Sequence, residues 1–289
     1  MPDLHSINHV GMAVASMDAA AARYAALGFT LTPFSMHSGS WKPGEPVQRL
    51  GWGNRCAVFP NDYLEILASV DDAAVPERIA GYLARHQGAH IICFGTDDAA
   101  AVEARLACNG VATTGVIPLQ RDVDTPQGVR TARFERLQFD PGATPEGYIQ
   151  AARHLTPEFI HQPRYMAHPN GATAMTETIL VTTQPDDLER RYAAYCGGPA
   201  VRDGPRRTFR FRMGSSLSIV ALADAPKVLP GSLLPAPPAI AGLAFRVASL
   251  DALRARLSAA SIRHATIDGG QRLVVPAEEA CGAALLFHS

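Results

Sequence analysis

Residues that can do chemistry recur at matching points of the chain. His9 lies in the apolar run INHVGMAVA at 7–15, and His90 lies in GAHIICFG at 88–95. Glu65 and Gln150 hold the same position in YLEI (63–66) and YIQA (148–151). Imidazole and carboxylate groups can transfer protons or bind a metal cation. Taken singly, a histidine in an apolar strand is usually a core residue, and a glutamate can simply face solvent. Their matching placement favours one shared site.

The run around His9 belongs to a repeat. It recurs in altered form as MTETILVTT at 175–183, with Glu177, and as IAGLAFRVA at 240–248, with Gly242. An acid that can begin a helix lies eight or nine residues after each of His9, His90, Glu177 and Gly242: Asp18, Asp98, Asp186 and Asp251. This register predicts four tandem modules. Each module consists of a strand, a helix and three further strands.

The elements of the first two modules must position these residues. We expect module one to run as strand 7–15, helix 18–27 ended by Gly28, strand 29–34, a long loop 35–54, and a hairpin of strands 55–60 and 63–68 across Asn61-Asp62. A helical connector at 69–87 leads to module two. There we expect strand 90–95, a helix to Cys108, and strands near 114–119, 129–139 and 147–153. Because alternate side chains of a strand share a face, Tyr63 and Glu65 point the same way.

Residues 154–172 interrupt this pattern with three histidines, three prolines and an Asn-Gly pair. They predict a division into two domains, residues 1–165 and residues 166–289. At the positions equivalent to the first site the second pair of modules has Glu177, Ser218 and Gly242, and it ends in the apolar strand ALLFHS. We therefore interpret the second domain as a degenerate duplicate that stabilises, dimerises or covers the first.

Composition limits the classes of function. A chain of 289 residues with 47% hydrophobic and 18% charged residues can bury two cores of ordinary size. The net charge of -1 disfavours binding to nucleic acid or to acidic lipid. The N-terminal residues lack the pattern of a secretory leader, and no apolar run is long enough for a membrane span. We expect a cytoplasmic protein that can form a homodimer and whose five scattered cysteines are reduced and buried.

Four strand-helix-strand-strand-strand modules resemble the vicinal oxygen chelate superfamily, which includes glyoxalase I, extradiol dioxygenases and bleomycin-resistance proteins. The most specific residues are INHVGMAV, the block from GWGNRCAVF to YLEI at 51–66, and HPNGA at 168–172. They look like the glyoxalase-like branch. The resemblance implies an α+β fold in which four tandem βαβββ modules form two open eight-stranded barrel-like domains. It also implies a metal site whose ligands, carried over by position, are His9, Glu65, His90 and Gln150.

The chemistry of these four residues agrees with that implication. Two neutral imidazoles, a carboxylate and an amide oxygen suit one divalent ion such as Zn, Ni, Co, Mn or Fe(II). A small substrate with adjacent oxygens would chelate the ion, which would then act as a Lewis acid. The resemblance thus implies a metal-dependent enzyme of the isomerase or lyase type, with Glu65 and Gln150 taking part in catalysis. Two alternatives stay open. One is an extradiol-type dioxygenase with Fe(II) held by His9, His90 and Glu65, and the other is a non-catalytic protein that sequesters a small molecule.

Five further residues are candidates for contacts with a substrate. Arg55 is suited to an anionic group, and Asn54 lies beside it at the start of a strand. Tyr63 and Tyr148 should share a face with Glu65 and Gln150. His168, in HPNGA, could reach the site from the boundary segment. Outside this set, His37 lies in the expected long loop and could act as an acid or base or have no role.

Overall fold

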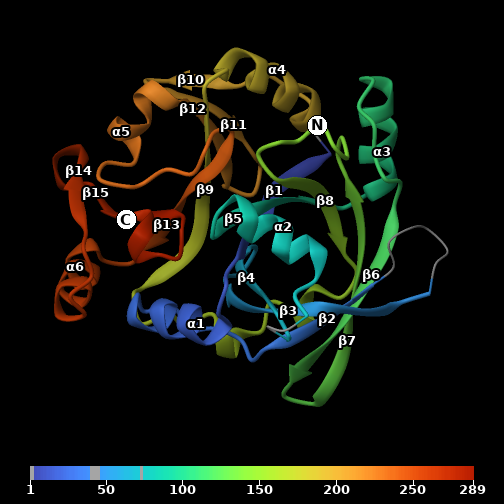
Figure 1. Cartoon of the computed structure of the whole chain (residues 1–289), viewed down its shortest axis with the longest axis horizontal. Helices are drawn as coiled ribbons and strands as arrows, with labels where there is room; N and C mark the ends of the chain where they lie inside the picture. Colours follow the sequence, from blue (N-terminus) through green and yellow to red (C-terminus); the bar gives the residue numbers. More distant parts are fainter. Residues whose placement is uncertain (1–2, 40–45, 72–73) are drawn as a thin grey trace.

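The computed structural model describes residues 3–39, 46–71 and 74–289. Its strands form two eight-stranded sheets that lie side by side, the first built from the N-terminal half of the chain and the second from the C-terminal half (Figure 1). The predicted α+β architecture of tandem modules is confirmed. One detail differs from the prediction, because the first sheet closes into a complete barrel while the second stays open.

The barrel closes because the two N-terminal modules pair at both of their edges. The first strands of the two modules pair antiparallel, and the second strands pair at the opposite seam. Within each module the first strand runs parallel to the last. The order around the barrel is β1-β4-β3-β2-β6-β7-β8-β5. Its strands are β1 (Leu4–Ala13), β2 (Ser35–Gly39), β3 (Gln48–Val58), β4 (Tyr63–Ser69), β5 (Gly88–Thr96), β6 (Ile117–Thr125), β7 (Gly128–Gln138) and β8 (Tyr148–His154).

The register of the parallel pairs decides which side chains share the barrel interior. In module one, His9 lies opposite Tyr63 and Gly11 lies opposite Glu65. In module two, Ile91 lies opposite Tyr148 and Cys93 lies opposite Gln150. Side chains at paired positions of neighbouring strands point to the same side of a sheet. The two modules are therefore equivalent when Tyr63 is matched to Tyr148, as the sequence predicted for these tyrosines.

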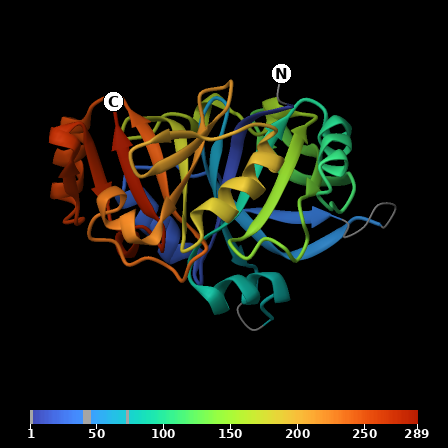
Figure 2. The ribbon, with the colours of Figure 1, turned by 90° about the horizontal axis from the view of Figure 1, so that it is seen from above.

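Two helices that pack on the outside of the barrel are fixed by side-chain caps. Ser16 accepts a hydrogen bond from the backbone N–H of Ala19 and begins α1 (Met17–Ala26). Asp98 caps α3 (Ala99–Cys108) in the same way. Such caps satisfy backbone donors that have no partner within the helix. A third helix, α2 (Glu77–Arg85), lies at a rim of the barrel and protrudes from the body of the molecule (Figure 2).

The second sheet has the order β10-β11-β12-β9-β13-β16-β15-β14. Its two edge strands have three residues each and do not meet. The elements are β9 (Ala172–Thr182), α4 (Pro185–Cys196), β10 (Val201–Asp203), β11 (Arg206–Arg210), β12 (Ser216–Ala221), α5 (Ala225–Val228), β13 (Ala239–Val247), α6 (Leu250–Ala259), β14 (Ala265–Ile267), β15 (Arg272–Val275) and β16 (Ala284–His288).

An apolar plug fills the face of the second sheet that corresponds to the barrel interior. Val228 and Leu229, at the end of α5, pack in one buried cluster with Ile179 and Leu286 from the sheet. Leu229 approaches so closely that a Cβ on Gly242 would lie 2.9 Å from its Cδ2 atom. Apolar side chains therefore occupy the space in which the first sheet holds its cavity. A larger core cluster joins the outer face of the barrel to the other face of this sheet.

Three local expectations need correction or refinement. Residues 29–34 form no strand, because Thr32 bonds only to Cys56 and builds no ladder. The expected loop 35–54 contains β2 and the first half of β3, paired with each other in an irregular register, and residues 40–45 lie outside the described residues. The connector helix is shorter than expected, at Glu77–Arg85. The hairpin across Asn61-Asp62 is confirmed.

Along the chain, two short 3-10 helices lie between β8 and β9: Pro157–Phe159 and Pro163–Tyr165. The expected domain boundary at 165/166 stays a prediction. All five cysteines are free thiols, and Cys108 is exposed where burial was expected. Among the described residues, no helix is both long enough and apolar enough to cross a membrane.

Candidate active site

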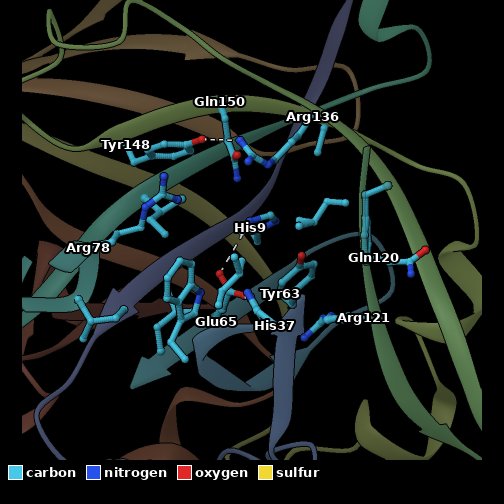
Figure 3. Close-up of a pocket in the computed structure, with 18 of the residues that line it drawn as sticks. His9, His37, Tyr63, Glu65, Arg78, Gln120, Arg121, Arg136, Tyr148 and Gln150 are labelled. Carbon is cyan, nitrogen blue, oxygen red and sulfur yellow. Dashed lines mark hydrogen bonds and ion pairs between the residues drawn. The ribbon is translucent and has the colours of Figure 1, made fainter. Parts of the chain in front are cut away.

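The interior of the barrel holds a cavity with an open mouth. Strands from both modules contribute side chains to its wall, and α2 contributes more at the rim. Figure 3 shows labelled side chains from β1, β2, β4, β6, β7, β8 and α2 around this space. One part of the wall is apolar, formed by Leu50, Trp52, Leu67, Ile79, Ile91, Leu119 and Phe134. The polar part centres on Glu65.

Glu65 lies buried among two imidazoles and an amide. Its Oε2 atom is 4.0 Å from Nε2 of His9, and its Oε1 atom is 3.4 Å from Nε2 of His37. Asn54 donates an amide hydrogen bond to Oε1, and Arg121 donates to the Oδ1 atom of Asn54 at 2.5 Å. Burial is the largest influence on Glu65 and raises its pKa. Contacts with His37, His9 and Arg121 together outweigh burial and lower the pKa to about 2, so the carboxylate is ionised.

His9 is held in one orientation and one protonation state. Its Nδ1 atom lies 2.8 Å from Oδ1 of Asn8, an oxygen that can only accept, so Nδ1 carries the proton. Its ring stacks on Tyr63, with 4.5 Å between the ring centres. Burial lowers the pKa of His9 to about 4. The imidazole is therefore neutral, and its Nε2 lone pair faces Glu65.

Aromatic and guanidinium groups stack at the mouth of the cavity. Arg136 donates a hydrogen bond of 2.7 Å to the hydroxyl of Tyr148. The guanidinium carbon of Arg78, from α2, lies 4.5 Å from the ring centre of Tyr148 and 5.7 Å from that of Trp52. These cation–π contacts fix α2 against the barrel at the entrance. Gln150 lies two residues further along β8 and lines the same cavity (Figure 3).

The structure does not bring His90 to the other predicted ligands. Ile91 lines the cavity, so its neighbour His90 points to the outside of the barrel, because adjacent side chains of a strand face opposite sides. There Nε2 of His90 donates to the backbone oxygen of His86 at 2.8 Å, and the ring stacks on Tyr82. The expectation of four converging ligands is corrected at this position. His90 is a packing residue beneath α2.

The donors that remain do not fit the metal ion implied by the resemblance. His9, His37, Glu65 and Gln150 line the cavity, but the position equivalent to His9 holds Ile91, which cannot bind a metal. Among residues 3–39, 46–71 and 74–289, no three His, Cys, Asp or Glu side chains are arranged to hold a metal ion. An amide is a weak replacement for an imidazole.

The predicted substrate contacts fall into two groups. Tyr63 and Tyr148 line the cavity, and Asn54 lies behind it, where it fixes Glu65. Arg55 and His168 do not line it. The backbone N–H of Thr30 donates to Nδ1 of His168, and Nε2 of His168 donates to the backbone oxygen of Val58, so this histidine ties the boundary segment to the barrel. Asn54 points inward on β3, which turns its neighbour Arg55 outward.

Sequence reasoning missed several residues of the cavity. His37, expected in a loop, lies in β2 and contacts Glu65. Arg121 lies in β6 and Arg136 in β7, and both point into the cavity. His154, expected in the boundary segment, ends β8 in phase with Gln150. Counting every second residue along YIQAARH would have found it.

A family model described as a glyoxalase-like domain matches residues 7–196. The chain resembles a hypothetical protein from Staphylococcus aureus, with a TM-score of 0.61, 13% identity, and 97% of this chain and 98% of that chain covered. It also resembles a mutant of 4-hydroxymandelate synthase from Streptomyces coelicolor, with a TM-score of 0.57, 12% identity, and 100% and 94% covered.

A third similar structure is the Mn(II)-bound glyoxalase from Novosphingobium aromaticivorans, with a TM-score of 0.53, 12% identity, and 99% of this chain and 82% of that chain covered. At these identities the solved structures establish the shared fold. No curated protein matches the sequence.

Proposed function

The chain belongs to the glyoxalase-like domain family of the vicinal oxygen chelate superfamily, and we propose that it is an enzyme that transfers protons on a small organic substrate inside the first barrel. One observation carries this proposal: the ionised Glu65 lies within 4.0 Å of the imidazoles of His9 and His37 in an enclosed, partly apolar cavity. A carboxylate in contact with imidazoles can accept a proton, hold it and pass it on.

The neighbours of Glu65 hold its carboxylate ionised and able to accept a proton, although burial opposes the charge. Burial favours its neutral, protonated form, and only the surrounding groups keep it charged before the reaction. A substrate that enters the cavity displaces water, and this makes the protonated form of Glu65 still more favourable. Asn54 holds the carboxylate in place, and the neutral Nε2 atom of His9 can receive the proton next. A proton removed at one carbon and returned at another gives isomerase chemistry, and loss of a leaving group gives lyase chemistry.

The substrate that suits this centre has an acidic C–H bond beside a carbonyl or hydroxyl oxygen. Oxygens next to the C–H bond make it more acidic, and the family resemblance also implies a substrate with adjacent oxygens. Ring-cleaving dioxygenation would need two histidines and a carboxylate that converge on Fe(II). His90 lies outside the cavity, and His9, His37 and Glu65 are not among any described trio of side chains arranged to hold a metal ion. The isomerase or lyase type therefore fits the site better.

A second candidate function is supported by one specific observation. Ile91 occupies the position of a metal ligand, as expected of a relative that sequesters a small molecule without turnover. The contacts of Glu65 with two imidazoles favour the enzyme, because a binding pocket with an apolar wall has no need of a buried ionised carboxylate.

Proton exchange into solvent separates the two functions. Native protein would be incubated in D₂O with a panel of small 2-oxo and 2-hydroxy carbonyl compounds, and loss of C–H signals would be followed by proton NMR. We expect exchange in at least one compound, reduced about 100-fold or more in Glu65→Gln. Glu135→Gln is the matched control, because Glu135 does not line the cavity and pairs with Arg153. Exchange at the native rate in Glu65→Gln, or no exchange in any compound, would contradict the proposal.

A further inference from the structure

His154 is the last inward residue of β8. Tyr148, Gln150, Ala152 and His154 alternate along this strand, and all four line the cavity. His154 pairs with Phe134 on β7, another residue of the cavity wall. The register of the strand therefore directs the imidazole into the same space that holds Glu65.

Neither ring nitrogen of His154 has a hydrogen-bond partner among the described residues, and both nitrogens are buried. Its neighbours are rings: Phe134 meets it edge-on with 4.8 Å between ring centres, and Tyr63 and His161 lie 6.1 and 6.0 Å away. A buried polar group without a partner lowers the stability of a protein. Such a group in a cavity wall is explained if it meets a ligand there.

The nearby His161 shows the contrast. Its Nδ1 atom donates to the backbone oxygen of Phe59 at 2.8 Å, as is usual for a histidine that serves the fold. His154 makes no such bond. Two half-buried histidines, 6.0 Å apart, thus differ in the one property that distinguishes a structural from a ligand-contacting role.

The charge state of His154 limits what it can recognise. Burial, followed by the influence of His9, His161 and Arg121, holds its pKa well below the usual value, so the ring is neutral. A neutral imidazole has one N–H donor and one acceptor nitrogen. A hydroxyl can pair with either nitrogen, because it can donate to the bare nitrogen or accept from the N–H. A carboxylate only accepts, and it would lose its hydration beside the ring of Phe134.

We propose that His154 is a ligand-contacting residue that recognises a hydroxyl group carried on an apolar body. The apolar body fits the wall formed by Phe134, Leu119 and Tyr63. This inference rests on the proposed function only in placing the ligand in the same cavity. It names a recognition residue of that ligand, whereas Glu65 performs the chemistry.

The test uses two probes of nearly the same shape, p-cresol and 4-fluorotoluene, which differ in the hydroxyl. Binding to the native protein would be measured by isothermal titration calorimetry. We expect p-cresol to bind about 10-fold more tightly than 4-fluorotoluene, because the site pairs a hydroxyl that the analogue lacks. In His154→Phe this preference disappears. A native protein that does not prefer p-cresol, or a variant that keeps the preference, overturns the proposal.

Stability gives a second, independent readout. Because His154 has no partner to lose, His154→Phe should melt at or above the native temperature, whereas His161→Phe should melt roughly 2–4 °C lower and keep the preference for p-cresol. A large fall in melting temperature for His154→Phe would show a structural role and overturn the proposal. Glu65→Gln should keep the preference for p-cresol. A failure of proton transfer and a failure of hydroxyl recognition are thus distinguishable.

Discussion

Ile91 pairs with Tyr148 across the parallel strands β5 and β8. The equivalent pair in module one is His9 with Tyr63, so one module presents an imidazole to the cavity and the other an aliphatic side chain. Gly11 makes room for this arrangement: a Cβ on Gly11 would lie 2.9 Å from Cβ of Ile91 and 3.2 Å from Oε2 of Glu65. The isoleucine is therefore packed beside the reactive carboxylate.

Gly11→Ala should destabilise the barrel by overpacking this contact. We expect a loss of about 1–3 kcal/mol in the free energy of unfolding, measured by urea denaturation. Adding Ile91→Ala should recover part of that loss, because it removes the atoms that the new methyl group meets. Strictly additive effects in the double variant would show that Ile91 and Gly11 do not share this space.

Asn54→Ala should cost about 2 kcal/mol or more of unfolding free energy, because it leaves both Glu65 and Arg121 without their common partner. The neighbouring Arg55→Ala, on the outward face of the same strand, should cost less than about 0.5 kcal/mol. Chemical denaturation of the two variants checks the difference. Equal losses would mean that Asn54 does not connect the two charges.

The stability of the native protein should fall as the pH falls from 6.5 towards 4, in part because of His9. The folded state depresses the pKa of His9 from 6.5 to about 4, so the unfolded chain binds a proton first and gains stability on acidification. The full effect of this group is about 3 kcal/mol. Between pH 7 and pH 4, the unfolding free energy of the native protein should therefore fall by about 3 kcal/mol more than that of His9→Gln. Parallel pH curves would contradict it.

Much of the fold could be predicted because the repeated sequence pattern marks the strands and helices of each module. The alternating run at His9, the hairpin across Asn61-Asp62 and the match of Tyr63 to Tyr148 all depend on local patterns that the structure keeps. His37 could not be found in this way. Its strand is short and only partly buried, and it meets Glu65 through the pairing of β2 with β3, which the sequence around it does not record.

The misplacement of His90 has a simple physical cause. The first acid of each helix does not mark the same helical position in every module, because the residues at the helix N-caps are Ser16, Asp98, Gln184 and Ser249. Seven residues before each cap lie His9, Ile91, Glu177 and Gly242, one from each module. The cap is fixed by backbone geometry, while an acid in the first turn is only favoured there. In a strand an error of one residue reverses the face, which exchanges Ile91 for His90.

The metal content of native protein and of Ile91→His, both purified without chelator, shows whether this barrel binds a metal ion. We expect far less than one equivalent of transition metal in the native protein. We expect about one equivalent in Ile91→His, where an imidazole from module two joins His9 and Glu65. His90→Ala should leave the content unchanged. About one equivalent in the native protein would contradict this expectation, and its loss in His90→Ala would show that His90 is a ligand.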